Sequence, residues 1–171
     1  MSVDWVVRSA GVADIPVIAG FNRAMAMETE GRRLDEETIV RGVRRLMDRP
    51  AAGFYLVAET GGRVEASLMV TYEWTDWRDG LFWWIQSVYV SPAYRRGGGF
   101  RALFDAVIDR ARADRDVRGI RLYVERDNAV ARRTYEALGM GACPYILYEW
   151  EFGHDDDGAD EGYNQSNGES R

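Results

Sequence analysis

The sequence predicts an α/β domain with a mixed central sheet and helices on both faces of that sheet. Three observations support this fold class. Short apolar runs typical of strands alternate with segments whose apolar residues recur every three or four positions, as they do in helices. The pair Gly61-Gly62 lies between two strand-like runs, which predicts an antiparallel hairpin. Residues 81–125 read strand, helix, strand, and this order predicts a parallel pair of strands with a right-handed crossover.

The elements follow from the apolar periodicity and from the turn residues between them. In order, they are a strand at 4–9, helices at 14–27 and 35–49, strands at 53–59, 64–72 and 81–90, a helix at 100–114, a strand at 119–125, a helix at 128–138 and a strand at 145–152. Asp14 and Asp35 are the expected N-caps of the first two helices, and Gly139 is the expected stop of the last one. An acidic turn is expected at 28–31 and a polar aromatic connection at 73–80.

The length and composition indicate one globular domain over residues 1–152. The chain has 171 residues, of which 46% are hydrophobic, so it can bury a sizeable core. Residues 153–171 are rich in Gly, Asp, Ser and Asn and hold almost no apolar side chain, so we expect a disordered acidic tail. That tail carries most of the formal net charge of −6, and the nearly neutral body gives no support for nucleic-acid binding.

The cysteine and histidine content argues against two kinds of site. Cys143 is the single cysteine and His154 the single histidine. A catalytic cysteine needs a histidine partner and a zinc site needs several such ligands, so no metal is expected. No apolar run is long enough to cross a bilayer, and the first residues lack the features of a signal peptide. We therefore expect a cytoplasmic protein with no membrane partner.

A glycine-rich turn between the buried strand at 81–90 and the following helix is the first candidate site. Residues 95–99 read Arg-Arg-Gly-Gly-Gly. Glycines let a backbone approach a ligand closely, and the unpaired N–H groups of a helix start favour an anion. The pattern predicts a phosphate cradle, and the alternative is an ordinary turn with solvated arginines. The Walker and dinucleotide-binding patterns are both absent.

The turn resembles the acyl-CoA loop of the GNAT superfamily of N-acetyltransferases. The residues that match are Val90, Pro92, Arg95 and Gly98, whereas Phe100 stands where the family has Gly or Ala. A second stretch matches the family's Asn-x-x-Ala-x-x-x-Tyr-x-x-x-Gly pattern, with Asn128, Ala131, Tyr135 and Gly139. The order of predicted elements also matches the GNAT fold, which implies that the parallel pair of strands splays apart.

The resemblance implies that acetyl-CoA lies in that splay, with a backbone N–H near Val88 facing the acetyl carbonyl. Tyr135 would then protonate the leaving sulfur as a general acid. The expected acetyl-CoA contacts are Val88, Tyr89, Val90, Arg95, Arg96, Gly97, Gly98, Gly99, Phe100, Arg101, Asn128 and Tyr135. The alternative for the second stretch is structural, because Asn128 suits a helix N-cap and Tyr135 lies on the apolar face of its helix.

The base and the acceptor site are less well marked. Family members often carry Glu before the bulge of the motif strand, but here Gln86 and Ser87 occupy that place. Glu73 is the first substitute and Glu125 the second, and each also suits a solvated carboxylate at a strand end. The expected substrate contacts are Glu28, Trp74, Trp77 and Gln86, since aromatic and acidic side chains suit a cationic amine. Alternatively, the tryptophans pack on neighbouring loops.

The sequence therefore predicts an acyltransferase that moves an acetyl group from acetyl-CoA to a primary amine by direct attack. The alternative is a binding protein rather than an enzyme, namely a non-catalytic acyl-CoA-binding module. Gln86 at the usual position of the base favours this alternative. A third reading is a nucleotide-phosphate binder that uses the glycine-rich turn differently. Family members often form homodimers, so the resemblance allows a homodimer.

Overall fold

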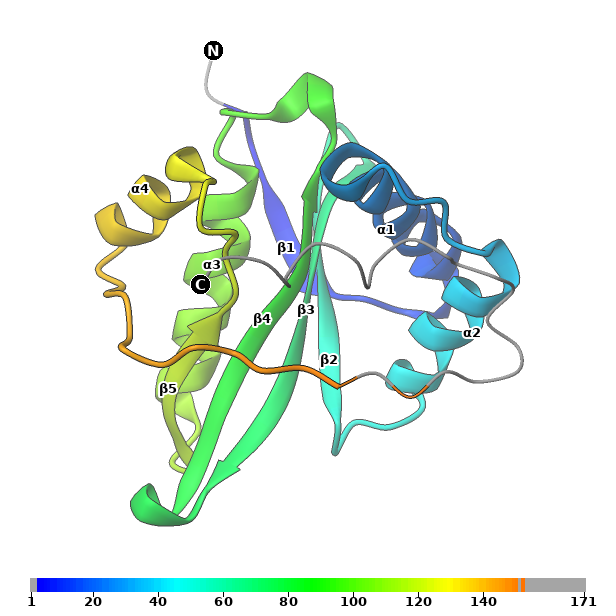
Figure 1. The fold of residues 1–171 in the computed structure, drawn as a ribbon. Helices are drawn as coiled ribbons and strands as arrows, with labels where there is room; N and C mark the ends of the chain where they lie inside the picture. Colours follow the sequence, from blue (N-terminus) through cyan, green and yellow to red (C-terminus); the bar gives the residue numbers. More distant parts are fainter. Residues whose placement is uncertain (1–2, 151, 153–171) are drawn as a thin grey trace, which may run out of the picture. The chain divides into compact units, whose positions relative to one another are not determined.

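The computed structural model describes residues 3–150 and 152, so the predicted tail at 153–171 lies outside the described residues. The chain divides into two compact units, which meet in sequence between Arg126 and Asp127 and are described separately. In the first unit the described strands form one sheet in the order β1-β2-β3-β4-β5 (Figure 1). The first three pairings are antiparallel and β4–β5 is parallel, which confirms the predicted mixed sheet.

The bounds of the elements are close to those predicted over most of the chain. The first unit contains β1 Val6–Ser9, η1 Val12–Asp14, α1 Ile15–Glu30, α2 Glu36–Met47, β2 Gly53–Thr60, β3 Arg63–Thr75, η2 Asp76–Arg78, β4 Gly80–Val90, η3 Pro92–Tyr94, α3 Gly99–Ala113 and β5 Val117–Leu122. The second unit contains α4 Ala129–Ala137. None of the helices in the described part of the chain has both the length and the apolar character that a bilayer span requires.

Helices cover both faces of the sheet, as predicted (Figure 1). Successive side chains of a strand point to opposite faces, and β2 shows this alternation. Tyr55 and Val57 pack with buried residues of α1 and α2. Phe54 points the other way, where the guanidinium of Arg110 on α3 lies 5.7 Å from its ring centre. The sheet therefore has one face under α1 and α2 and the other under α3.

The hairpin between β2 and β3 turns on the two predicted glycines. Gly61 and Gly62 have φ angles of 57° and 76°. Two consecutive residues in the left-handed region are the requirement of the turn that joins twisted antiparallel strands, and glycine adopts it without steric cost. The prediction of this hairpin is confirmed.

Three stretches of the chain show the clearest differences from the prediction. Residues 28–30 continue α1 rather than forming a turn. The helix ends only at Gly31, whose left-handed φ of 65° caps it. The connection predicted at 73–80 shrinks to η2 and Asp79, because β3 extends to Thr75. The strand predicted at 119–125 spans Val117–Leu122 instead, since its register is set by pairing with β4.

Asp14 has a different role from the predicted N-cap. Its side chain makes no capping bond at the start of α1. Instead, Asp14 Oδ2 accepts from the backbone N–H of Gly11 at 2.7 Å, and both carboxylate oxygens accept from Arg8. The Arg8 guanidinium holds the pKa of Asp14 below its usual range. Asp14 thus ties β1 to the turn that precedes α1.

The strand predicted at 145–152 is wrong for the residues that the structure describes. Residues 145–150 and 152 form no sheet pairing. Their large apolar side chains are exposed, from 64% for Leu147 to 90% for Tyr148. The alternating pattern fits a strand, but a strand needs a neighbour for its backbone hydrogen bonds, and the pattern alone does not supply one.

Candidate functional site

The candidate site is built around a bulge in β4. The pairing register with β3 shifts between Ser67 and Met69, and Ser87 takes a left-handed φ of 48° at the bulge. The pairing with β5 ends at Ile85, although β4 continues to Val90. No strand in the described part of the chain pairs with the last five residues of β4 on the β5 side. The parallel pair thus splays open as predicted, and the backbone around Val88 is available to a ligand on that side.

The predicted cradle follows β4 after the short helix η3. Arg96 and Gly98 have φ angles of 62° and 88°, so the turn places two residues in the left-handed region before α3 begins at Gly99. Turns of this kind can present backbone N–H groups to an anion, and here the N–H of Gly97 is already bonded to the carbonyl oxygen of Tyr94 at 3.0 Å. The first N–H groups of a long helix have no intrahelical acceptor, and the helix dipole adds positive potential there.

Trp5, which directly precedes β1, contacts this turn. Its indole Nε1 donates to the carbonyl oxygen of Gly97 at 2.8 Å. A Cβ on Gly99 would lie 2.8 Å from Trp5 Cζ2, which is closer than real contacts allow, so glycine is required there. The ring of Trp5 also makes an edge contact with Tyr94, with the ring centres 5.8 Å apart. Sequence reasoning missed Trp5, because nothing local links residue 5 to residue 97.

The start of α3 explains the departure from the family pattern. Phe100 is half-buried, and its ring centre lies 5.8 Å from that of Phe104, which is buried. The helix's apolar stripe predicts that Phe100 points into the core, whereas the structure leaves it half-buried at the edge of the core. Arg101 pairs with Asp105 one turn later, with Nε 2.8 Å from Oδ2. The Nε donor of the exposed Arg101 guanidinium is therefore already bonded to Asp105.

Arg95 connects the cradle to the end of α1. Its Nε donates to the carbonyl oxygen of Val90 at 3.0 Å, and its Nη2 donates to Glu28 Oε2 at 2.5 Å. The hydroxyl of Tyr89 donates to the other Glu28 oxygen at 2.9 Å. The bond from Arg95, and then that from Tyr89, lowers the pKa of Glu28. The predicted acceptor residue Glu28 thus lies beside the predicted cradle residues Tyr89, Val90 and Arg95.

Gln86 lies one residue before the bulge, as predicted. It is half-buried, and its amide Nε2 donates to the hydroxyl of Thr71 on β3 at 2.5 Å. The usual family base position therefore holds an amide in a side-chain hydrogen bond.

Glu73 lies in a different part of the sheet. Its Oε1 accepts from Arg121 Nη1 at 2.7 Å, and its Oε2 accepts from the indole N–H of Trp84. Glu73 pairs in register with Phe82, and at about 3.3 Å per strand residue this position is about 20 Å from Val88. This distance separates the backbone positions, and the carboxylate itself is held by Arg121 and Trp84, so a role as base would require a relay of water molecules. Glu125 lies three residues beyond the end of β5 rather than at its end.

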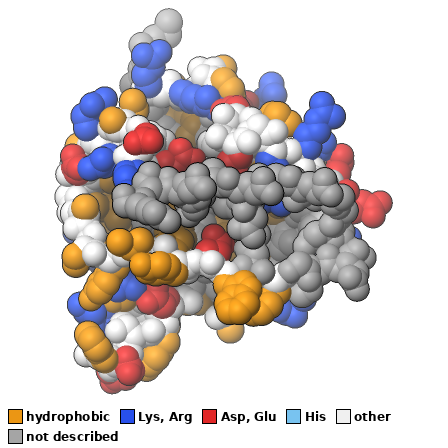
Figure 2. Space-filling model, viewed as in Figure 1, with side chains coloured by type: hydrophobic (Ala, Val, Ile, Leu, Met, Phe, Trp, Pro, Cys, Tyr) orange, Lys and Arg blue, Asp and Glu red, His pale blue; other side chains and the backbone are white. Residues whose placement is uncertain are grey.

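Trp74 and Trp77 lie at the tip of the β3–β4 hairpin. They are 61% and 87% exposed, and Figure 2 shows hydrophobic side chains beside acidic ones at this lower left end of the view. Trp74 pairs in register with Leu81, which is about 30 Å along β4 from Val90. The structure therefore does not bring the tryptophans together with Glu28, and one small amine cannot contact both groups.

The second unit carries the other predicted motif. Asn128 caps α4, because its side-chain oxygen accepts from the N–H of Ala131 at 3.0 Å. Gly139, with φ 87°, follows the helix end as predicted. Tyr135 is half-buried, and burial raises the pKa of its phenol. The structural role expected for Asn128 is confirmed, whereas its contact with pantetheine and the acid role of Tyr135 stay predictions.

The model of the acetyltransferase (GNAT) family matches residues 21–140, which include the bulge, the cradle and the motif of α4. The chain belongs to the GNAT family. A possible acetyltransferase from Clostridium difficile 630 is 44% identical, over 88% of this chain and 99% of that one, with a TM-score of 0.82. No protein of curated function matches the chain. The GNAT fold supports acyl transfer in general.

Two more distant structures show the same fold. A transcriptional regulator from Bacillus halodurans C-125 is 21% identical, over 87% of this GNAT chain and 100% of that one, with a TM-score of 0.74. A predicted acetyltransferase with acetyl-CoA from Clostridium acetobutylicum is 17% identical, over 85% and 96% of the two chains, with a TM-score of 0.70. At these identities the likeness concerns the fold alone.

Proposed function

We propose that this GNAT acetyltransferase moves an acetyl group from acetyl-CoA to a primary amine by direct attack. The observation that carries the proposal is that the bulge and the cradle follow one another closely along the chain, the first on β4 and the second after it. The bulge at Ser87 leaves backbone groups open on β4, and the anion cradle at residues 95–99 begins five residues after that strand ends. Acetyl-CoA carries a thioester at one end and a pyrophosphate further along, so it needs open backbone groups for the thioester and an anion cradle for the phosphates.

The residues of the cradle suit the phosphates of acetyl-CoA. Arg96 adds positive charge to the N–H groups at the start of α3, and Gly98 leaves open space where a side chain would stand. Arg95 is already bonded to Glu28 and Val90, so we assign it mainly to fixing the loop. Trp5 supports the same loop through Gly97.

The chemistry requires a neutral amine and a leaving thiol. The amine nitrogen forms a bond to the acetyl carbon, the bond from that carbon to sulfur breaks, and the nitrogen loses a proton to solvent. The N–H of Val88 would stabilise the charge that develops on the carbonyl oxygen. Tyr135 would give its proton to the departing sulfur, and its raised pKa keeps it protonated at neutral pH.

The end of α1 supports a cationic acceptor. Glu28 is a carboxylate that stays ionised to lower pH than usual, and it lies next to Tyr89 at the splayed end of β4. We assign Glu28 to binding the ammonium form of the acceptor, which must lose one proton to solvent before it attacks, with Gln86 as a neutral polar neighbour of the bulge. Glu73 is not assigned a direct contact with the acceptor because of its distance from Val88.

A thiol-release assay over a broad panel of primary amines tests the proposal. The proposal predicts release of CoA that depends on both acetyl-CoA and at least one amine, with an equal amount of acetylated amine. The amide at Gln86, in place of a carboxylate, favours a non-catalytic acyl-CoA-binding module as the second candidate. Tight binding of acetyl-CoA without amine-dependent thiol release over the panel would favour that module instead.

A further inference from the structure

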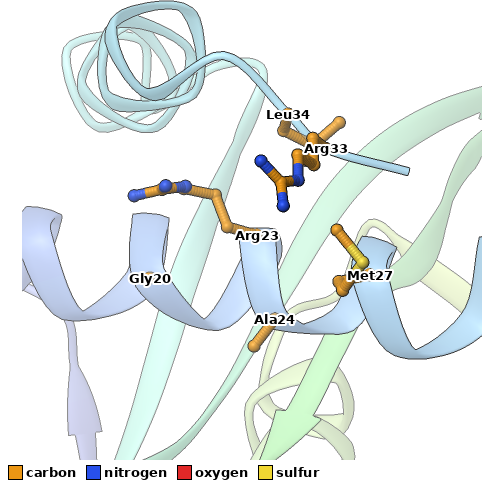
Figure 3. A pocket seen from close by; sticks show the side chains of 6 residues that line it. All are labelled: Gly20, Arg23, Ala24, Met27, Arg33 and Leu34. Carbon is orange, nitrogen blue, oxygen red and sulfur yellow. The ribbon is translucent and has the colours of Figure 1, made fainter. Parts of the chain in front are cut away.

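A separate pocket of about 360 Å³ lies between α1 and the loop that leads to α2 (Figure 3). Six residues line it: Gly20, Arg23, Ala24, Met27, Arg33 and Leu34. On α1, positions 20, 24 and 27 form one stripe by helical spacing. The stripe differs from the buried one that includes Ile18 and Asn22, whereas Glu28 lies one turn beyond Ala24 and does not line the pocket. The pocket lining thus shares no residue with the proposed acetyl-transfer site.

The wall opposite the helix is anchored at both ends. After α1, the backbone N–H of Gly31 donates to Met27 and that of Arg32 donates to the carbonyl oxygen of Ala26, each at 3.2 Å. At the other end, Asp35 caps α2 by accepting from the N–H of Thr38 at 2.7 Å. The short segment between these anchors carries two of the lining residues. A ligand would thus meet a pocket whose walls are formed in advance.

The lining combines two guanidinium groups with apolar side chains. Arg23 donates one bond, at 2.8 Å, to Glu36, which leaves most of its five N–H donors for another acceptor. Arg33 makes no ion pair or hydrogen bond with another residue in the described part of the chain, and Figure 3 shows its guanidinium directed from the loop toward α1. Met27, Leu34 and Ala24 supply the apolar part. This combination suits a planar oxyanion joined to an apolar body.

Gly20 keeps the pocket open. It lies within α1, where glycine is less favourable than alanine by about 1 kcal/mol. No atom lies within 4 Å of the position that its Cβ would take, so packing does not require a glycine there. A longer side chain at position 20 would instead project into the pocket. Gly42 in α2 also has free space around its Cβ but does not line the pocket, which makes it a matched control.

We infer that this pocket binds a small organic carboxylate with an apolar body, held by Arg23 and Arg33. The volume lies at the lower end of the range of small-molecule sites, about 300–1,000 Å³. The inference does not rest on the proposed function, because none of the lining residues is assigned to acetyl transfer.

Titration of the full chain with hexanoate, followed by the ligand's NMR signals, tests the inference. Hexanoate should bind saturably, whereas the neutral hexanamide should bind at least tenfold more weakly, since the oxyanion bonds are lost. Arg33→Gln should lower hexanoate affinity about tenfold or more, because one charged donor is removed. Gly20→Leu should lower it at least as much, while Gly42→Leu should leave it unchanged.

Three results would overturn the inference. The first is the absence of saturable hexanoate binding to the wild-type chain. The second is wild-type affinity in both Arg33→Gln and Gly20→Leu, with each variant melting as one cooperative unit. The third is a pair of results: CoA abolishes hexanoate binding, and Arg33→Gln leaves hexanoate affinity unchanged. These two results together would place the carboxylate in the cradle. Retained binding in the presence of saturating CoA supports the separate pocket.

Discussion

Substitution of Gly98 by Asp and by Asn separates the charge of the cradle from its backbone conformation. Gly98 has φ 88°, and the nearest atom to a Cβ at this position would be Trp5 Nε1, at 4.0 Å. Both substitutions therefore fit sterically and carry the same backbone cost, about 1–2 kcal/mol for a side chain in the left-handed region. In a chain of this length, that cost lowers the melting temperature by about 2–8 °C.

The difference between the two variants measures the charge alone. A carboxylate about 5 Å from one phosphate charge is repelled by about 0.8–3 kcal/mol, for effective dielectric constants of 80 to 20. Gly98→Asp should therefore bind acetyl-CoA about 4-fold to 200-fold more weakly than Gly98→Asn. The gap should shrink as salt is added, since the site is exposed. Calorimetric titration of both variants at two salt concentrations gives these values. Equal affinities in two folded variants would refute a phosphate site at Gly98.

Three further predictions test the catalytic and structural assignments. Tyr135→Phe should leave acetyl-CoA affinity nearly unchanged and lower kcat by about 10²- to 10⁴-fold. In the wild type, the dependence of kcat on pH should show no loss of this acid below about pH 10. Glu73→Gln should keep kcat near wild type but lower the melting temperature, because Arg121 loses its charged partner; a large fall in kcat would restore Glu73 as the base. Asp14→Asn should cost about 1.5–3 kcal/mol at pH 7. Because Arg8 lowers the pKa of Asp14, this stabilisation is present above the ordinary value of 3.8 and is lost as pH falls through the lower folded-state value, so the melting temperatures of variant and wild type should converge in acid.

The parts of the fold that depend on local chemistry could be predicted from the sequence. The hairpin follows from Gly61-Gly62, and the cradle follows from a glycine-rich stretch between an apolar run and an amphipathic helix. In both places, the glycines that permit the unusual backbone conformation lie within the turn itself, so a short stretch of sequence is enough to predict it. The end of α1 shows the limit of this reasoning, because Gly31 and the acidic residues before it were all compatible with a turn.

The parts that depend on distant residues could not be predicted. The bond from Trp5 to Gly97 joins residues 92 positions apart, and the bond from Arg95 to Glu28 joins residues 67 positions apart. A sequence pattern carries no signal for such pairs. The strand predicted at 145–152 is wrong for the described residues for a related reason. Their alternation suits a strand, but strand formation depends on a partner elsewhere in the chain.

A crystal structure of the chain with acetyl-CoA is the most direct test of the central claim, that the bulge and the cradle together hold the thioester and the phosphates. The claim predicts that the pyrophosphate lies against the backbone of residues 96–99 and that the acetyl carbonyl faces the N–H of Val88. A pyrophosphate bound away from that turn, or a thioester that does not enter the splay between β4 and β5, would contradict it.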